Sequence, residues 1–139
     1  MTHLSRRHLI ALSAAFAATP AFAAYDASVY QPGLLTELRK SGKVFVFNFG
    51  ASWSLTSQIK RDAIAELKQA NPDYLANITF VDIDWDTYGP SQMAERLKVK
   101  RHSTLLALKG KSELGRLEGE IEMRQIKAFL DDTLQAARA

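Results

Sequence analysis

Two serines three residues apart, Ser54 and Ser57, stand where a helical pattern begins in the stretch NFGASWSLTSQIK, residues 48–60. A serine immediately before a helix is a favoured N-cap, because its side-chain oxygen accepts a backbone N–H of the first turn. We interpret Ser54 as such a cap and Ser57 as a tolerated residue of the first turn. Alternatively, the free N–H groups at the positive end of the helix and the two hydroxyls form a small site for an anion or a carbonyl oxygen.

Hydrolytic chemistry at Ser54 would need a general base that takes the hydroxyl proton. His102 is the only histidine after residue 23, and it adjoins Ser103. The sequence has neither a G-x-S-x-G turn nor an evident acidic residue to orient the histidine, so a hydrolase is not favoured and His102 is interpreted as a solvated loop residue. One histidine, no cysteine and scattered carboxylates do not make a set of metal ligands, and no cofactor is expected.

The N-terminal segment, residues 1–23, has the pattern of a cleavable export signal. Arg6 and Arg7 precede an apolar run that is too short to span a bilayer, and an A-x-A site follows at 21–23. Paired arginines before a weakly apolar, alanine-rich run are typical of the twin-arginine export route, although an ordinary secretory signal can contain such a pair by chance. We therefore predict cleavage after residue 23 and a periplasmic domain at 24–139.

The composition is that of a soluble globular domain. The whole chain of 139 residues is 47% hydrophobic and 24% charged, and removal of the signal takes away two of its 18 basic groups and none of its 15 acidic ones. A remainder of 16 basic and 15 acidic groups, without a basic stripe interleaved with aromatics, does not favour a nucleic-acid partner. Because the chain has no cysteine, its stability rests on a packed core rather than on disulfides.

Hydrophobic periodicity predicts alternating helices and strands. The expected order is a helix at 32–42, a strand at 43–50, a helix at 55–70, a strand at 77–86, a short helix at 91–97, a strand at 103–110, a strand at 112–119 and a helix at 122–136. Such alternation favours parallel strands with helices on both sheet faces, and the last two strands form an antiparallel hairpin at one edge. The predicted fold class is α/β, with a mixed sheet of four to five strands flanked by helices and no transmembrane segment after residue 23.

The same periodicity assigns individual side chains to the two sides of these elements. Leu55 is placed on the apolar face of the helix at 55–70, and Met123 on the inner face of the last helix. Asp82, Asp84 and Asp86 alternate along the strand at 77–86 and are expected to share one of its faces. We interpret these carboxylates as solvated groups at the strand end rather than as a cation site.

Three stretches resemble the thioredoxin superfamily and together cover nearly all of the chain after residue 23. VFVFNFGASWSLTS resembles the strand, loop and active-site turn that usually ends W-C-x-x-C. NITFVDIDWDTYGPSQMAERLKV resembles the second central strand and the short helix after it, and VKRHSTLLALKGKSELGRLEG resembles the Pro-Thr loop and the closing hairpin. The wording around Asn48, which is expected to be buried, is closer to exported TlpA/ResA-type thioredoxins than to cytoplasmic thioredoxin.

The resemblance implies that Ser54 and Ser57 occupy the positions of the two redox cysteines. A serine hydroxyl is not ionised, so it neither attacks a disulfide nor forms one. As written, the chain is therefore not a dithiol oxidoreductase. The resemblance also places Ser103 where most of the family has a cis-proline. A cis bond before a residue other than proline costs roughly 2.5–4 kcal/mol, so a trans bond or a local rearrangement is expected there.

The resemblance further implies a face that binds an extended polypeptide, made by Trp53, Ser54, His102, Ser103 and Thr104. Backbone pairing with an extended segment needs no thiol. Trp53 is expected either on the rim of this face, partly exposed, or half-buried over the end of the sheet.

Two functions follow. The first is an exported thioredoxin-like protein that lacks redox cysteines and binds an extended peptide or an envelope partner protein. The alternative is a thiol–disulfide oxidoreductase of the bacterial envelope whose catalytic cysteines are replaced by Ser54 and Ser57 in this variant. A purely structural subunit of an envelope complex is a third class, which an exposed apolar patch away from the site would favour.

Overall fold

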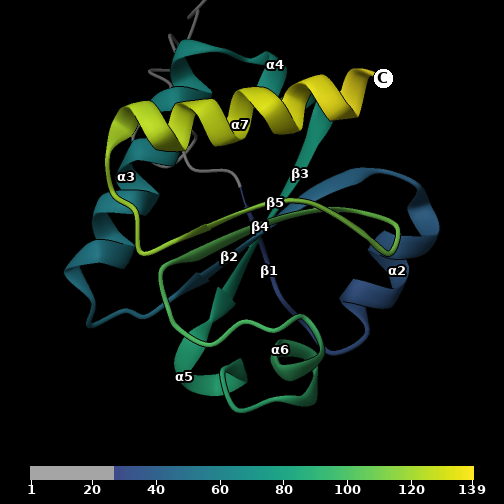
Figure 1. The fold of residues 1–139 in the computed structure, drawn as a ribbon, viewed down its shortest axis with the longest axis vertical. Helices are drawn as coiled ribbons and strands as arrows, with labels where there is room; N and C mark the ends of the chain where they lie inside the picture. The colour runs from purple at the N-terminus through teal and green to yellow at the C-terminus, as the bar shows by residue number, and fades with distance from the viewer. Residues whose placement is uncertain (1–26) are drawn as a thin grey trace, which may run out of the picture.

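The computed structural model describes residues 27–139, so the predicted export signal lies outside the described residues. The described chain forms a five-stranded sheet in the order β1-β3-β2-β4-β5 (Figure 1). The strands are β1 (Ser28–Val29), β2 (Val44–Gly50), β3 (Ile78–Asp84), β4 (Thr104–Lys109) and β5 (Ser112–Glu118). The predicted mixed sheet is confirmed, and it has the upper of the two expected strand numbers.

The central strand β2 is rich in valine and phenylalanine, and its first six residues are all buried. Such a run fits a strand that is covered on both faces. β2 pairs in parallel with β3 and antiparallel with β4, while β1 extends the parallel side and β5 closes the antiparallel side as a hairpin with β4. The carboxyl ends of β2 and β3 and the beginning of β4 therefore meet at one end of the sheet.

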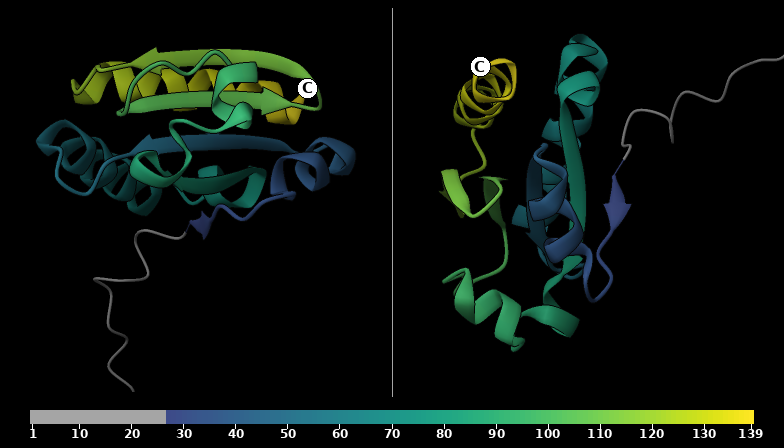
Figure 2. Two further views of the ribbon diagram at one scale, coloured as in Figure 1. Left: turned by 90° about the horizontal axis from the view of Figure 1, so that it is seen from below. Right: turned by 90° about the vertical axis from the view of Figure 1, so that its right-hand side faces the viewer.

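Helices cover both faces of the sheet, as the alternating pattern predicted. The helices are α2 (Leu34–Ser41), α3 (Leu55–Ala70), α4 (Asp73–Asn77), α5 (Trp85–Tyr88), α6 (Gln92–Arg96) and α7 (Met123–Arg138). α3, α4 and α7 pack against one face, and α2, α5 and α6 against the other. Figure 2 shows α7 lying along the β4–β5 hairpin. Among residues 27–139, none of the helices has the length and apolar content that a membrane span needs.

Two hydrophobic cores result from the alternation of side chains along the strands. Val46 and Leu105 point into the core beneath α3, α4 and α7. Phe45, Phe47 and Phe49 point into the opposite core, where their rings lie edge-to-face or tilted against one another. Both faces of β2 are consequently sealed, so the turn that follows it starts from a fixed position.

Three short elements were not expected from the sequence. β1 has two residues, α4 has five and begins directly after Pro72, and α5 begins directly after β3. The early end of β3 corrects the prediction for the acidic residues, because Asp84 caps α5 by accepting from the Thr87 N–H at 3.2 Å. Asp86 therefore lies in α5 and does not share a strand face with Asp82.

Two side chains predicted to be buried are exposed. Leu55 is 68% exposed, and Met123 is 37% exposed. Each stands at the first position of its helix, and the buried faces begin only at Ser57 in α3 and at Ile126 in α7. The prediction for both was wrong because the first turn of each helix begins outside the hydrophobic core.

Candidate functional site

The candidate site lies where β2, α3 and β4 meet at one end of the sheet. β2 ends at Gly50, a turn over residues 51–54 leads into α3, and the loop at 101–104 leads into β4. The pairing of Phe49 with Thr104 places this loop directly beside the turn. The sheet thus brings together two segments that lie about fifty residues apart in the sequence.

Ser54 is the N-cap of α3, as predicted. Its backbone is extended, and its Oγ accepts the Ser57 N–H at 3.3 Å. The interpretation of Ser57 as a merely tolerated residue was wrong. Ser57 is buried, its Oγ accepts the Ala51 N–H at 3.1 Å, and the same Oγ lies 2.8 Å from Ser103 Oγ. Ser57 therefore ties the turn after β2 to the loop before β4.

A chain of hydroxyl groups joins the two segments. Ser54 Oγ lies 2.8 Å from Thr56 Oγ1, and Thr56 Oγ1 lies 2.9 Å from Ser103 Oγ. His102 Nδ1 also approaches Ser103 Oγ, at 3.1 Å. Ser103 is fully buried, so its hydroxyl is a junction inside the protein and is not accessible to a substrate.

Residues 27–139 contain no cis peptide bond, so the bond before Ser103 is trans. The φ angle of Ser103 is 58°. The predicted trans bond is confirmed, and the rearrangement is a left-handed backbone. This conformation costs a residue other than glycine roughly 1–2 kcal/mol. Contacts from outside the loop are therefore needed to hold it.

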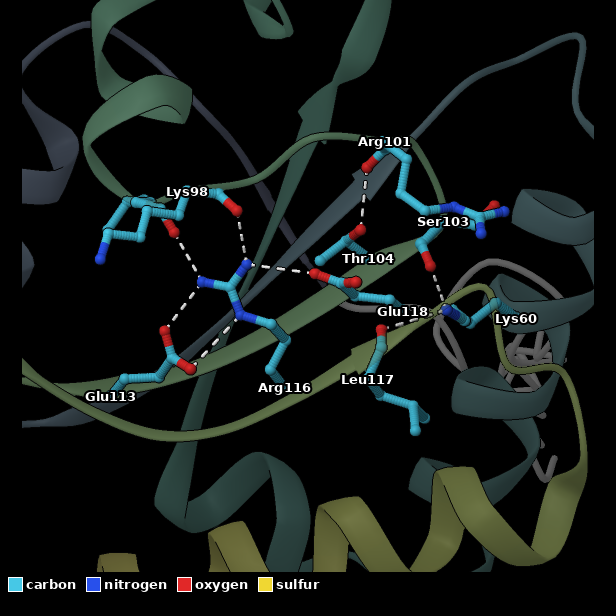
Figure 3. A network of polar contacts seen from close by, with 10 residues as sticks. Lys60, Lys98, Arg101, Ser103, Thr104, Glu113, Arg116, Leu117 and Glu118 are labelled. Carbon is cyan, nitrogen blue, oxygen red and sulfur yellow. Dashed lines mark hydrogen bonds and ion pairs between the residues drawn. The ribbon is translucent and has the colours of Figure 1, made fainter.

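Lys60 supplies such a contact, and sequence reasoning did not find it. Its side chain is fully buried under the loop, and its Nζ donates to the Ser103 carbonyl and, at 3.5 Å, to the Leu117 carbonyl (Figure 3). Burial and the neighbouring Arg101 charge lower the pKa of Lys60 to about 8, against the opposing effects of Glu120 and Glu118.

Gly119 provides the other donor to this carbonyl. Its N–H donates to Ser103 O at 2.9 Å, and its φ of 67° lies in the left-handed region that favours glycine. A Cβ at this position would stand 2.9 Å from Cζ of Arg101, so the absence of a side chain lets the guanidinium of Arg101 lie against the end of β5. The 101–104 loop is thus attached to both α3 and the segment after β5.

A second polar cluster in Figure 3 secures the approach to the loop. Arg116 in β5 donates to the carbonyls of Leu97 and Lys98, at 2.6 and 2.8 Å, and pairs with Glu113 and Glu118. The hydrogen bond to Glu113 is the main reason that the pKa of Arg116 is raised. Arg116 therefore carries its charge throughout the physiological range and holds the end of α6 against β5.

Trp53 is the most exposed aromatic side chain of the site. It is 65% exposed, which agrees with the rim position and not with the half-buried one. Its indole N–H donates to both carboxylate oxygens of Asp86, at 3.0 and 3.2 Å, and its ring stands edge-on to His102 with centroids 4.9 Å apart. The predicted solvated His102 is in fact half-buried between Trp53 and Ser103.

The other predicted site residues have mainly internal contacts. Thr104 is fully buried and its hydroxyl donates to the Arg101 carbonyl at 2.8 Å, so it supports the site from inside the protein. Asn48 is buried, as predicted, and with Ser57 it lines a pocket of about 390 Å³ at the carboxyl ends of β2 and β3. Arg61 and Asp82, paired at 3.9 Å, lie at the same pocket.

This arrangement is suited to binding and not to hydrolysis. Ser54, Ser57 and Ser103 are buried, and their hydroxyls are linked in one network through Thr56, so none of these three serines is both exposed and adjacent to a base. Within residues 27–139 no group of three histidine, cysteine or acidic side chains is placed to hold a metal ion. Of the side chains predicted for the site, Trp53 is exposed and His102 is half-buried, while Ser54, Ser57, Ser103 and Thr104 are buried.

Comparisons with known proteins agree with this fold. The sequence matches no protein-family model and no curated protein. Among solved structures, Trxlp from Edwardsiella tarda EIB202 is 20% identical with a TM-score of 0.66, covering 76% of this chain and 98% of its own. Thioredoxin from Malassezia sympodialis is 16% identical with a TM-score of 0.67, covering 78% of this chain and 93% of its own. A cysteine-to-serine mutant of Entamoeba histolytica thioredoxin is 23% identical with a TM-score of 0.62, covering 76% of this chain and 98% of its own.

These likenesses show the fold, which is thioredoxin-like. The sequence contains no cysteine. Ser54 is the N-cap of α3, and Ser57 follows three residues later in the first turn of the helix. The chain is therefore a thioredoxin-like protein without redox cysteines.

Proposed function

We propose that this chain is an exported, periplasmic thioredoxin-like protein, of the TlpA/ResA type, that binds an extended segment of an envelope partner protein. The binding face, which we call the candidate face, presents Trp53 and one side of His102, and the buried residues Ser54, Ser103 and Thr104 support it from inside the protein. The observation that carries the proposal is the Trp53 side chain. A large aromatic ring that is both exposed and fixed in place can bury apolar surface on a partner at little cost in conformational entropy.

The contacts of Trp53 support this role. Asp86 accepts the indole N–H and His102 makes a T-shaped contact with the ring, so the ring is oriented although most of it faces solvent. Tryptophan is among the residues that most often dominate binding energy at protein interfaces. An exposed, oriented tryptophan can therefore anchor an extended segment through its aromatic surface.

Replacement of Trp53 by alanine tests the proposal. We expect Trp53→Ala to weaken binding of an unfolded polypeptide, such as reduced and carboxymethylated α-lactalbumin, by about thirtyfold or more, because loss of an interface anchor costs about 2 kcal/mol or more. The free energy of unfolding should change little, since 65% of the side chain is exposed. Isothermal titration calorimetry and urea denaturation measure the two effects.

Leu114→Ala is the matched control for this experiment. Leu114 is an exposed apolar residue of β5, outside the candidate face. Equal losses in the two variants, or unchanged binding in Trp53→Ala, would contradict binding at the candidate face. A loss confined to Leu114→Ala would favour a surface on β5 and the function of a structural subunit.

Export is proposed from residues 1–23, with their paired Arg6 and Arg7 and their A-x-A site. We expect the protein recovered from the periplasm of a bacterial host to begin at Ala24. Arg6→Lys with Arg7→Lys should keep the full-length chain in the cytoplasm if the twin-arginine route is used. N-terminal sequencing of the fractions measures both results, and a full-length N-terminus in the periplasm would contradict the predicted cleavage.

The alternative function is that of a thiol–disulfide oxidoreductase whose cysteines have been replaced. The placement of Ser54 and Ser57 on the first turn of α3 favours it, because both positions of the usual C-x-x-C carry the closest isostere of cysteine. The codons for positions 54 and 57 in the source chromosome distinguish the two functions. Serine codons support the binding protein, whereas cysteine codons support a disabled oxidoreductase.

A further inference from the structure

Lys60 is a buried cation that has no acidic partner in hydrogen-bond contact among residues 27–139. Its side chain has no exposed surface, and the contacts of its Nζ are the backbone carbonyls of Ser103 and Leu117. A buried lysine is rare unless its charge is compensated. Two carbonyl dipoles compensate the charge of a buried ammonium group only modestly. We therefore look for a structural effect of these two contacts on the segments that carry the carbonyls.

The contacts of Lys60 fall on the residue with the least favourable backbone in the loop. Ser103 is one of two residues other than glycine with positive φ among residues 27–139. Its carbonyl receives the Gly119 N–H from one segment and Lys60 Nζ from α3, while its Oγ is held by Thr56, Ser57 and His102. Lys60 thus reaches the Ser103 carbonyl from α3, as Figure 3 shows.

We propose that Lys60 is a positioning residue that holds the backbone of the 101–104 loop in its left-handed shape and so fixes the candidate face. The side chain acts through Ser103 and does not itself touch a partner, because it is buried. The inference rests on the proposed function for what the loop binds, whereas the geometry of the loop can be tested without any partner.

His102 links the backbone of Ser103 to the exposed ring of Trp53. His102 precedes Ser103 in the chain, its imidazole contacts Ser103 Oγ, and its ring makes a T-shaped contact with the ring of Trp53. A change of the Ser103 backbone would therefore displace both the loop and the support of the exposed indole. Loss of Lys60 is expected to reach Trp53 although the two side chains have no direct contact.

Lys68 offers a matched control on the same helix. It is also buried in α3, in the last turn of the helix, and its Nζ lies 3.9 Å above the centroid of the Phe80 ring. Lys60→Met and Lys68→Met each replace a buried lysine by an unbranched apolar side chain of similar length. Any general effect of removing a buried lysine from α3 appears in both variants.

Amide hydrogen exchange without a partner is the first measurement. In Lys60→Met we expect the Gly119 amide, which donates to Ser103 O, to exchange at least tenfold faster relative to the Phe47 amide of the core. Lys68→Met should leave this ratio within twofold of the wild type. Equal ratios in the two variants would overturn the inference and assign Lys60 a general structural role.

Binding is the second measurement, made where each variant is fully folded. Reduced and carboxymethylated α-lactalbumin should bind Lys60→Met at least tenfold more weakly than wild type and Lys68→Met within twofold. Wild-type affinity in Lys60→Met would overturn the inference. If the wild type itself binds no polypeptide, the proposed function fails, and the exchange ratio alone decides whether Lys60 holds the loop.

A second pair of variants covers the case in which the methionine variants do not fold. Lys60→Gln keeps N–H donors without the charge, and Lys68→Gln makes the same change at the control position. We expect a smaller rise of the Gly119 exchange ratio in Lys60→Gln, of about threefold, and none in Lys68→Gln. Absence of any difference within this pair would overturn the inference as well.

Discussion

The double replacement Ser54→Cys with Ser57→Cys is expected to produce a protein that forms an internal disulfide under a mild oxidant. Ser54 Oγ accepts the Ser57 N–H, so both side chains lie on the first turn of α3, at the spacing of the C-x-x-C motif. The ring that the disulfide closes is already formed by the cap and the first turn. Loss of alkylation by iodoacetamide under denaturing conditions, reversed by dithiothreitol, measures the disulfide.

The helix dipole at position 54 favours the thiolate that starts disulfide formation. A thiol at position 54 would stand at the N-terminus of a sixteen-residue helix, where the dipole lowers a cysteine pKa from ~8.5 to roughly 3.5–7.5 in comparable motifs. We expect the single variant Ser54→Cys to react with iodoacetamide at pH 7 more slowly than its thiolate fraction alone would allow, because the position is only 5% exposed.

The control pair is Ser41→Cys with Ser57→Cys. Ser41 ends α2, next to the beginning of β2, whereas Ser57 lies beyond the end of that strand. Both thiols of the control pair should therefore stay free under the same oxidant. A double variant at 54 and 57 that also keeps two free thiols would contradict the assignment of these positions to a redox pair.

The sequence was sufficient to predict the main strands of the sheet, because each of them has a hydrophobic pattern that can be recognised locally. The buried run from Val44 to Phe49 and the alternating pattern of β3 are typical of strands, and they differ clearly from the 3.6-residue period of the helices. β1 was not predicted, because a strand of two residues is too short to show a periodic pattern. α5 was not predicted, because its N-cap, Asp84, is also the last residue of the preceding strand.

The site was predictable only in part, because its geometry depends on contacts between distant segments. The cap role of Ser54 is a local property, and it was predicted. The burial of Ser57 and Lys60 is set by the polar loop that packs on the first two turns of α3, and that loop lies more than forty residues away. The same packing turns Leu55 outward, since the buried face near the start of the helix must meet carbonyls and hydroxyls.

Lys60 also illustrates why a pattern of residue types can mislead. A lysine between Ile59 and Arg61 reads as a solvated position, because lysine is almost never fully buried. A flexible side chain with three N–H donors can nevertheless reach two carbonyls at once, as it does for Ser103 and Leu117. No periodicity reports such a contact, whereas the absence of the usual proline before Thr104 was a signal that some other group must hold the loop.

The buried amine of Lys60 makes a strong prediction about stability and pH. Its pKa is about 8 in the folded protein and 10.5 in the unfolded chain. Below pH 8 both states hold the proton, and between pH 8 and 10.5 the unfolded state holds a proton that the folded state has released. The free energy of unfolding should therefore rise with pH across this window, by roughly 3 kcal/mol in total, at 1.36 kcal/mol per pKa unit.

Urea denaturation of the wild type and Lys60→Met, from pH 7 to 10.5, isolates this contribution as the difference between two curves. Tyr30 and Tyr74 have raised pKa values, mainly through burial, and oppose the rise as pH passes 10, but they do so equally in both proteins. Lys43→Met, at an exposed position, checks the loss of a lysine as such. Parallel curves for wild type and Lys60→Met would mean that the amine keeps access to water, and the contact that holds Ser103 would then be too weak to shape the loop.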